Sequence, residues 1–584
     1  MSASPVSASP SDPRHITVGW EIPREEYCDQ PYVVVTDEEA WLCVMTTARG
    51  HEGARSQHIV ATRSTDRGRT WSPLVDVEPP GPPESSYATV LKAPNGRVFA
   101  FYNHNTDNCR DVKRSDGSSE TRVDTQGHFV WKFSDDGGLT WSPERQEILV
   151  RESRVDRENA HGGAIRFFWH VGRPLALNGA AYVTLHKVGS FERRGFMNHS
   201  EGWFLRSPNL LTEPDPAKVT WETLPEGDVG LRAPGSTIAE EQSIVALSDQ
   251  RSLFCTYRTI AGSPAAAYSR DEGRTWTLPA FMTYADGRPV KHPRAANFVW
   301  KCANGCYLYW FHNHGGKWYE DRNPAWLLGG VEADGPSGEK VILWSEPEIL
   351  LYDDDPNVRM SYPDLIEQEG IFYATETQKT VARVHEIDAT LLNGLWGQFG
   401  PGAVTRDGLL LEQAADVPAG AAPRLTDLRQ VESGFSVEVW LAFEGRMAAQ
   451  TIADTRGPDG PGWSLETTHR ETVRLTLSDG RTENTWECDP NSLRPEGWQH
   501  IVVTVDGGPK IITFVVNGRF CDGERHRQFG WGRFSPHLRD VSGGELLVVP
   551  PRRRAQLGVL RMYGRPLRTS EAVGNFHAGF PTGG

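Results

Sequence analysis

The sequence lacks several features that would place it in common classes of protein. No apolar run reaches the length of about 18 residues that a membrane-spanning helix needs. The 61 basic residues are outnumbered by 76 acidic ones, which gives a net charge of −15, and no basic patch stands out. We therefore expect neither a membrane nor a nucleic acid as a partner.

Cysteine is also scarce, with eight residues in a chain of 584, which is too few for a disulfide scaffold. Cys302 and Cys306 lie close together in KCANGC, but a zinc site would need a second pair or nearby histidines. We therefore expect reduced structural cysteines, with no cofactor.

The amino-terminal stretch MSASPVSASPSDPRH is rich in Ser and Pro and has no apolar core segment. It is typical of a disordered leader, predicted over residues 1–14, rather than of a secretory signal. This predicts a cytoplasmic location, or secretion if a signal segment has been lost. The length of the remaining chain predicts two domains.

A repeated pattern is the most informative feature that the chain does contain. Three segments read S-x-D-x-G-x-T-W, namely Ser64–Trp71, Ser134–Trp141 and Ser269–Trp276. The aspartate can accept hydrogen bonds from backbone N–H groups of a turn, and the glycine adopts a positive φ easily. The tryptophan can bury a large apolar surface against the same sheet. The pattern therefore predicts tight turns between strands in a repeat architecture.

This repeat resembles the Asp-box of the sialidase superfamily, whose members fold as six-bladed β-propellers with the boxes between the third and fourth strands of a blade. The resemblance implies the same fold here. The spacing of tryptophans along the chain supports six blades, because roughly 50–80 residues separate the successive members of the set Trp71, Trp141, Trp221, Trp276, Trp344 and Trp396. The boxes indicate the fold rather than the chemistry.

Two domains follow from the pattern of strands. Residues 15–397 contain short apolar stretches separated by Gly, Pro, Asn and Asp turns, and we assign them to the propeller. Later stretches such as FSVEVWLAF and WQHIVVTVDG alternate like half-buried antiparallel strands. Their order resembles a laminin-G/concanavalin-like β-sandwich, or jelly roll, over residues 398–584. The predicted fold class is all-β, and the sandwich either binds carbohydrate or serves packing.

The resemblance also implies site residues. Sialidases hold a substrate carboxylate with three arginines and attack with a tyrosine that a glutamate activates. The segment EEQSIVALSDQRSLFCTYR resembles the stretch that would make Glu241 this glutamate and Arg258 the second arginine. SYPDLIEQEGIFYATE is similar to the segment that would make Tyr362 the nucleophile and Glu376 an orienting glutamate. Arg322 in DRNPAWL is the candidate third arginine.

Two positions depart from the family pattern. Asp29, in CDQPYVVV, stands where the first arginine is expected. His58, in SQHIVATRSTD, stands where sialidases have an aspartate that acts as the general acid. An imidazole can donate a proton near neutral pH. Our predicted catalytic set is therefore His58, Tyr362, Glu241 and Asp29. Because Asp29 would repel the carboxylate of sialic acid, we expect a different terminal sugar.

The carboxylates Asp29 and Glu376 leave two alternatives open. If they face each other, one is protonated or a cation is shared, and Arg24 or Lys379 would supply the counter-charge. Otherwise they form a carboxylate pair suited to glycoside hydrolysis, whose separation would set the stereochemical outcome.

Several stretches concentrate His, Asn and Arg where a strand should be apolar. Buried polar groups need partners, so these stretches either line a cleft or form hydrogen bonds between blades. The substrate-binding residues predicted here are Arg294, His292, His312, His104 and His161. His312 and His314 share one face of a strand, which leaves a metal as a weaker alternative.

The leading hypothesis is an exo-acting glycoside hydrolase of sialidase-like type that cleaves a terminal, possibly anionic sugar and is not a true sialidase. One alternative is a polysaccharide lyase that acts on a uronate through His58 and Tyr362. Another is a propeller that binds glycans without catalysis. All three imply a carbohydrate partner, and the sequence indicates no oligomeric state.

Overall fold

The computed structural model describes residues 12–120, 124, 126–191, 197–414, 420–430, 433–444, 449–457, 460–494, 496–548 and 555–580. Strands dominate these residues, so the predicted all-β class is confirmed. The chain divides into two compact units. The larger unit comprises Gly19–Trp344 and Pro356–Ala389, and the smaller unit is the rest of the described chain. None of the described helices has the length and apolar character that crossing a membrane requires.

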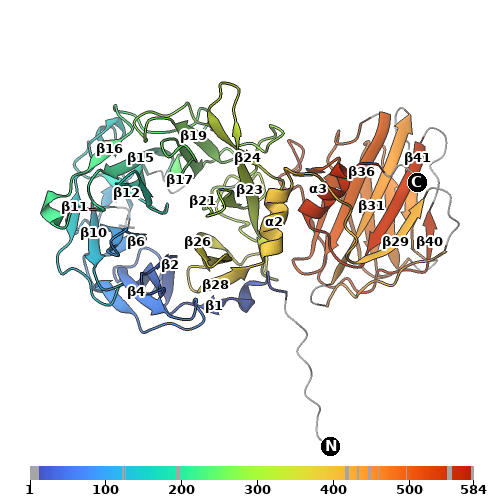
Figure 1. Cartoon of the computed structure of the whole chain (residues 1–584), viewed down its shortest axis with the longest axis horizontal. Coiled ribbons are helices and arrows are strands. Elements are labelled where there is room, and N and C mark those ends of the chain that lie inside the picture. The colour runs from blue at the N-terminus through green and yellow to red at the C-terminus, as the bar shows by residue number, and fades with distance from the viewer. Residues whose placement is uncertain are drawn as a thin grey trace, which may run out of the picture. The chain divides into compact units, whose positions relative to one another are not determined.

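The larger unit is built from four-stranded antiparallel paths that follow one another around a ring (Figure 1). The first path is β2 (Tyr27–Val35), β3 (Trp41–Ala48), β4 (His58–Ser64) and β5 (Val75–Glu78). The second is β6 (Ser85–Lys92), β7 (Val98–His104), β10 (His128–Ser134) and β11 (Gln146–Ile148). The third is β12 (Phe167–Trp169), β14 (Ala180–Ser190), β15 (His199–Ser207) and β16 (Glu222–Leu224), with β13 (Leu175–Leu177) beside β14.

The ring continues through three more paths. The fourth is β17 (Glu240–Ala246), β18 (Leu253–Arg258), β19 (Ala265–Ser269) and β20 (Ala280–Phe281), and the fifth is β21 (Phe298–Lys301), β22 (Tyr307–Phe311), β23 (Ala325–Asp334) and β24 (Lys340–Trp344). The last is β26 (Ser361–Gln368), β27 (Ile371–Thr377), β28 (Ala382–Ile387) and the amino-terminal β1 (Trp20–Glu21). The blade count of six stays a prediction, which these six sheets support.

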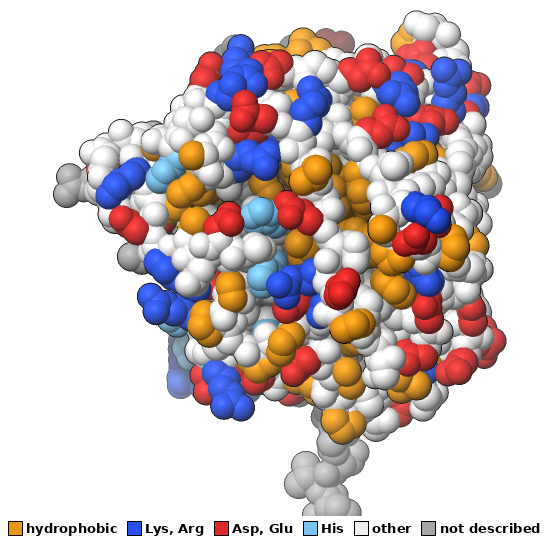
Figure 2. Space-filling view, turned by 90° about the vertical axis from the view of Figure 1, so that its left-hand side faces the viewer, with side chains coloured by type: hydrophobic (Ala, Val, Ile, Leu, Met, Phe, Trp, Pro, Cys, Tyr) orange, Lys and Arg blue, Asp and Glu red, His pale blue; other side chains and the backbone are white. Residues whose placement is uncertain are grey.

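Minor elements of this unit are β8 (Val112–Lys113), β9 (Ser119–Glu120), α1 (Arg154–Arg157) and η2 (Pro216–Lys218). Acidic and basic side chains are interspersed on the face shown in Figure 2, without a continuous patch of either sign. No disulfide joins the eight cysteines, all of which lie within the described residues.

The three repeats form the same hydrogen-bonded turn between the third and fourth strands of their sheets. In the first, Gly68 N donates to Ser64 Oγ at 2.8 Å and Thr70 N donates to Asp66 Oδ1 at 2.8 Å. The copies that begin at Ser134 and Ser269 repeat these contacts. Because every bond lies within a few residues, the turn is encoded locally.

The smaller unit is a sandwich of two antiparallel sheets. One has the order β29 (Leu409–Ala414), β41 (Ala555–Tyr563), β31 (Gly434–Glu444), β36 (Glu496–Asp506), β37 (Ile511–Val516) and β38 (Arg519–Phe520), with β39 (Gly532–Arg533) beside β37. The other has the order β30 (Gly420–Ala421), β40 (Glu545–Val548), β32 (Gln450–Asp454), β33 (Gly462–Thr467), β34 (Val473–Ser478) and β35 (Glu483–Glu487). Alternate side chains of both sheets, such as Val437 and Leu465, share one buried core.

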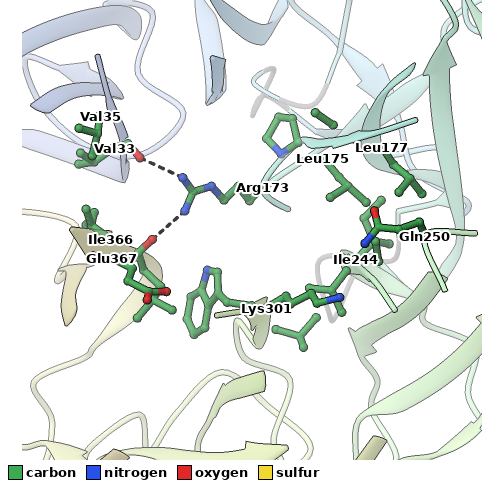
Figure 3. A pocket seen from close by; sticks show the side chains of 17 residues that line it. Val33, Val35, Arg173, Leu175, Leu177, Ile244, Gln250, Lys301, Ile366 and Glu367 are labelled. Atoms are coloured by element: carbon green, nitrogen blue, oxygen red, sulfur yellow. Dashed lines mark hydrogen bonds between the residues drawn. The ribbon is translucent and has the colours of Figure 1, made fainter. Parts of the chain in front are cut away.

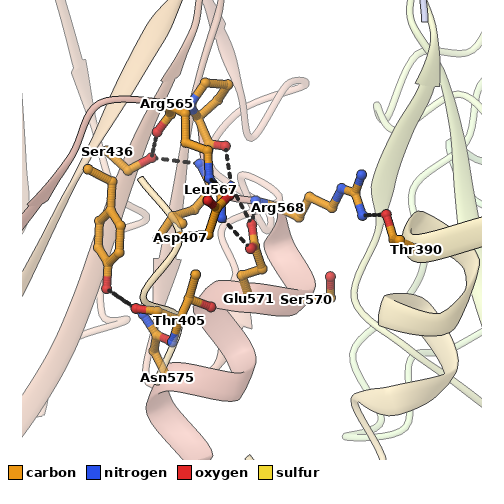
Figure 4. A network of polar contacts seen from close by, with 12 residues as sticks. Thr390, Thr405, Asp407, Ser436, Arg565, Leu567, Arg568, Ser570, Glu571 and Asn575 are labelled. Atoms are coloured by element: carbon orange, nitrogen blue, oxygen red, sulfur yellow. Dashed lines mark hydrogen bonds and ion pairs between the residues drawn. The ribbon is translucent and has the colours of Figure 1, made fainter. Parts of the chain in front are cut away.

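Short elements complete the smaller unit: η1 (Ile16–Val18), β25 (Glu348–Leu351), α2 (Ala389–Gly397, of which Ala389 falls in the larger unit) and α3 (Thr569–His577). Polar contacts hold α3 (Figure 4). Glu571, in its first turn, accepts from Arg568 N at 2.8 Å and binds Arg565 at 2.6 Å. The predicted leader lies outside the described residues up to residue 11, and Arg14 binds Asp506 at 2.6 Å.

Candidate functional site

The first strands of four sheets in the larger unit carry the same local distortion. Each has a β-bulge near its beginning, in β2, β6, β17 and β26. One residue in each bulge has a positive φ, which is 54° at Gln30, 60° at Tyr87, 61° at Glu241 and 47° at Tyr362. A bulge re-aims a side chain, and a positive φ costs strain outside glycine. Three of these four side chains line one cavity.

This cavity has a volume of about 270 Å³. Pockets for drug-sized ligands span roughly 300–1,000 Å³, so the space suits a single sugar unit. Four cationic side chains and two carboxylates face it, which makes the lining predominantly positive. The lining residues are Glu52, Tyr87, Trp169, Glu241, Arg258, Tyr319, Arg322, Arg359, Tyr362 and Lys379.

A second cavity, of about 480 Å³, is lined in part by later residues of three of these first strands, β2, β17 and β26 (Figure 3). Most of its lining side chains are apolar, among them Val33, Ile244 and Ile366. Its arginine, Arg173, is bound to Asp364 at 2.9 Å and to a backbone carbonyl at 2.7 Å. Because that charge is already neutralised, we take the smaller cavity as the candidate active site.

Tyr362, Glu241 and Arg258 form a connected group in the smaller cavity. The Tyr362 hydroxyl donates to Glu241 Oε1 at 2.9 Å, and Arg258 Nη1 lies 2.8 Å from the same oxygen. Burial raises the pKa of Tyr362, and Glu241 raises it further. Burial also raises the pKa of Glu241, although Arg258 acts in the opposite direction. A neutral phenol beside a strengthened base can act as a nucleophile whose proton passes to the carboxylate.

Glu240 supports this group from behind the cavity wall. It lies 2.8 Å from Arg258 and 2.6 Å from Arg294, and none of its surface is exposed. Burial alone would raise the pKa of Glu240, but Arg294 and Arg258 outweigh it and hold the pKa at about 2. Arg294, which the sequence predicts to bind substrate, does not line the cavity and instead anchors Glu240.

Lys379, on another part of the lining, forms ion pairs with two carboxylates, Asp29 and Glu52. Its Nζ lies 2.6 Å from Asp29 and 3.4 Å from Glu52, and 4.5 Å from the centre of the Tyr362 ring. Burial raises the pKa of Asp29 to about 6, although Lys379 lowers it. Asp29 does not line the cavity, so its contact with the site passes through Lys379.

Arg322 and Arg359 lack such partners. Arg322 is 4% exposed, and it donates to Tyr319 O at 2.9 Å and Ser361 Oγ at 2.7 Å. Burial lowers the pKa of Arg322, and Arg359 adds to this effect. Among the residues that the structure describes, neither arginine has a carboxylate within ion-pair distance.

The structure does not bring His58 to the cavity. Its Nδ1 lies 2.9 Å from Ser56 O and its Nε2 3.8 Å from Asp76, and it is absent from the lining. Glu376 is also absent from the lining, and its Oε1 lies 3.4 Å from His385 Nε2. Asp29 and Glu376 thus have separate partners. The predicted meeting of His58 with Tyr362 is not found.

Two of the predicted binding histidines hold backbone groups instead. His292 Nδ1 accepts from His312 N at 3.1 Å, and His312 Nδ1 lies 3.2 Å from Pro324 O. Both rings are fully buried, and burial lowers the pKa of His292 to about 3. These contacts match the alternative stated above, in which the histidines form structural hydrogen bonds rather than bind substrate.

The other two predicted histidines also lie away from the cavity lining. His104 Nδ1 lies 2.8 Å from Thr106 Oγ1, and burial lowers the pKa of His104 to about 4. His161 Nε2 accepts from Lys113 N at 3.0 Å. Within the described part of the chain, no group of three His, Cys, Asp or Glu side chains is arranged to hold a metal ion.

Sequence reasoning missed several lining residues. Tyr87 and Trp169 stack with ring centres 6.1 Å apart and planes inclined by 29°, which gives the cavity an aromatic wall. Tyr87 follows two serines at the start of a strand, much as Tyr362 follows Ser361, and this similarity was a usable signal. Glu52 and Arg359 lie in loops without a recognisable pattern.

Comparison with known proteins identifies the smaller unit most clearly. A family model of the concanavalin A-like lectin/glucanases superfamily matches residues 419–567. This range covers most of the sandwich, so the predicted concanavalin-like domain is confirmed. No curated protein sequence matches the chain significantly.

Among solved structures, a sialidase of Trypanosoma rangeli is 12% identical over 95% of this chain and 94% of that one, with a TM-score of 0.42. The intramolecular trans-sialidase from Ruminococcus gnavus, in complex with oseltamivir carboxylate, is 15% identical over 65% of this chain and 97% of that one, with a TM-score of 0.44. A Dyadobacter fermentans protein of unknown function is 13% identical over 63% and 98%, with a TM-score of 0.45. Likeness at this level carries no argument about the reaction.

Proposed function

We propose that the chain is an exo-acting glycoside hydrolase that removes a terminal anionic sugar. The observation that carries this proposal is the buried group of Tyr362, Glu241 and Arg258 in a predominantly cationic cavity. A neutral phenol attacks an anionic sugar with less repulsion than a carboxylate would meet. A volume of about 270 Å³ favours one terminal sugar over an internal stretch of polymer.

The proposed reaction has two displacements. In the first, the Tyr362 oxygen bonds to the anomeric carbon while its proton passes to Glu241. The glycosidic bond breaks, and the leaving oxygen takes a proton from Glu52. In the second, water gives its proton to Glu52 and its oxygen to the anomeric carbon, and Tyr362 recovers its proton from Glu241. Two displacements retain the anomeric configuration.

Glu52 replaces His58 as the proton donor in this proposal. Glu52 lines the cavity with Glu241, and they are the two carboxyl groups of the lining. Lys379 lies 3.4 Å from Glu52 but only 2.6 Å from Asp29, so Asp29 neutralises much of its charge. We therefore assign the role of proton donor to Glu52, the lining carboxyl group that does not contact Tyr362.

Sialic acid is not the substrate that we favour. Asp29 stands where the resemblance implies an arginine, and the cation beside it, Lys379, already binds two carboxylates. A lysine is a point charge and lacks the planar fork that binds a carboxylate with two hydrogen bonds. A smaller acidic sugar, such as a uronate, suits the cavity better.

A uronate lyase is the second candidate, because Arg322 has no carboxylate partner among the described residues and can stabilise the enolate of such a reaction. Tyr362 would then exchange the protons. It now lacks the imidazole that the sequence suggested as its partner, since His58 does not line the cavity.

Oligosaccharides that end in glucuronate, galacturonate, sialic acid or a neutral hexose test these proposals. We expect release of an acidic monosaccharide with retained configuration, seen by mass spectrometry and proton NMR. Tyr362→Phe should abolish release while circular dichroism stays unchanged. A product with the ultraviolet absorption of an unsaturated uronate would establish the lyase, and release of neutral sugars alone would refute the anionic substrate.

A further inference from the structure

The second cavity, of about 480 Å³, has the size of a pocket for a small organic ligand, and the proposed reaction does not use it. It lies further along the inner strands than the candidate active site. In β26, Leu365 of its lining follows Tyr362 by three residues. In β17, Ile244 follows Glu241 by the same interval. At about 3.3 Å for each residue of a strand, roughly 10 Å of chain separates the two linings, so the second cavity is a site of its own.

Two polar side chains of the second cavity are available to a ligand. Lys301 Nζ lies 5.7 Å from the centre of the Tyr307 ring, and among the described residues it has no carboxylate within ion-pair distance. Glu332 attracts Lys301 from beyond that distance and already accepts from the Tyr307 hydroxyl. Gln250 hydrogen-bonds to the described residues through its backbone only, so its side-chain amide can still donate.

The other two charged side chains of this lining are engaged within the protein. Arg173 lies 2.9 Å from Asp364, which neutralises its charge. Glu367, the carboxylate of the lining, accepts from Ala303 N at 2.8 Å. The charge that the cavity offers to a ligand is therefore the positive charge of Lys301.

The available polar groups lie next to an apolar wall. Figure 3 shows the amino end of Lys301 and the side-chain amide of Gln250 on the side of the cavity where Leu177 and Ile244 lie. The guanidinium group of Arg173 turns away from them, to the opposite side. Leu177 and Ile244 are buried and can cover the apolar part of a ligand. A cation beside such a wall suits a ligand that is acidic at one end and apolar along the rest.

We propose that the second cavity binds a small amphipathic carboxylate. Its acidic end accepts hydrogen bonds from Lys301 and Gln250, and its apolar chain lies on Leu177 and Ile244. A neutral molecule with the same chain gains only the apolar contacts, and an amine is repelled by Lys301. The proposal is independent of the reaction proposed for the smaller cavity, because the two linings share no residue.

Isothermal titration calorimetry of the full chain at pH 7 tests the proposal with octanoate, octanamide and octylammonium. The three probes have nearly the same apolar chain and differ in the charge of the head group. We expect octanoate to bind most tightly and octylammonium least tightly. Added salt should weaken the binding of octanoate and leave that of octanamide unchanged, because only the first depends on charge.

Lys301→Met keeps an apolar stem of similar length and removes the charge. It should weaken octanoate about ten-fold, as the loss of a hydrogen bond between charged groups predicts, and should leave octanamide unchanged. Lys218→Met, which removes a lysine whose side chain is 70% exposed in η2, is the matched control. Ala176→Phe adds a ring at an exposed position of the lining and should weaken all three probes, while circular dichroism stays unchanged.

Three results would overturn the proposal: octanoate does not bind, octylammonium binds as tightly as octanoate, or Lys301→Met binds octanoate unchanged. Because the smaller cavity is also cationic, Arg359→Ala is measured in parallel. Weaker octanoate binding in Arg359→Ala but not in Lys301→Met would place the carboxylate in the smaller cavity and would equally refute the proposal.

Discussion

Replacing Glu240 tests the electrostatic account of the site most directly. Its carboxylate is fully buried, and it lies 2.8 Å from Arg258 and 2.6 Å from Arg294. Its pKa falls from the usual 4.5 to about 2. With about 1.4 kcal/mol for each tenfold change in proton affinity, this fall corresponds to about 3 kcal/mol of folding free energy. Glu240→Gln should therefore lower the free energy of unfolding by about 3–5 kcal/mol at neutral pH, because it leaves the buried Arg294 without its carboxylate partner and Arg258 with Glu241 alone.

The stabilisation that Glu240 provides should decrease as the pH is lowered. The pKa of Glu240 is lower in the folded chain than in the unfolded chain, so its stabilisation is complete above pH 4.5 and is lost as the pH falls towards 2. Glutamine does not titrate in this range. The difference in unfolding free energy between the wild type and Glu240→Gln should thus be constant above about pH 5. It should become smaller as the pH falls towards 2.

Urea unfolding followed by tryptophan fluorescence measures this difference, with a separate transition fitted for each unit. Glu144→Gln, a neutralised glutamate on the exposed surface, is the matched control and should change stability little. A difference below about 1 kcal/mol at neutral pH, or one that is equal at every pH, would refute the reasoning.

Three further predictions concern the reaction and the ion pair of Asp29 with Lys379. Glu241→Gln should lower turnover about 10²–10⁴-fold by removing the base beside the phenol, and unchanged turnover would exclude that role. Glu52→Gln should slow the hydrolysis of substrates with alkyl leaving groups far more than that of nitrophenyl glycosides. If His58→Ala showed this pattern and Glu52→Gln did not, the imidazole would be the proton donor. Lys379→Met should destabilise the protein more at pH 7 than at pH 5, as measured by urea unfolding. The reason is that the buried Asp29, whose pKa is already about 6, loses its cation. Equal losses of stability at the two pH values would contradict this.

Part of the site was predictable because its residues lie in patterned strands. Tyr362, Glu241, Arg258 and Arg322 all line the cavity, as the motif comparison implies. Tyr362, Glu241 and Arg258 lie in a first or second strand, whose alternation of apolar residues fixes which side chains face the same way, and Arg322 precedes the third strand β23.

Other predicted residues lie away from this cavity, for a physical reason. His58 was located by counting back from the first repeat, which forms a turn at the far end of the same strand. Distance along the chain does not show whether that strand reaches the central cavity. The histidines of polar stretches were buried as expected, but burial alone does not distinguish a cavity wall from a backbone hydrogen bond.

The amino-acid sequence alone determined the turns of the three repeats and the alternating pattern of the strands, because these depend on residues a few positions apart. Only the tertiary structure decided which charges of the cavity are neutralised. Lys379 meets Asp29 across 350 residues of sequence, and Tyr362 meets Glu241 across 121. Among the described residues, Arg322 and Arg359 have no carboxylate at ion-pair distance for the same reason, since closure of the ring brings the carboxylates to other cations.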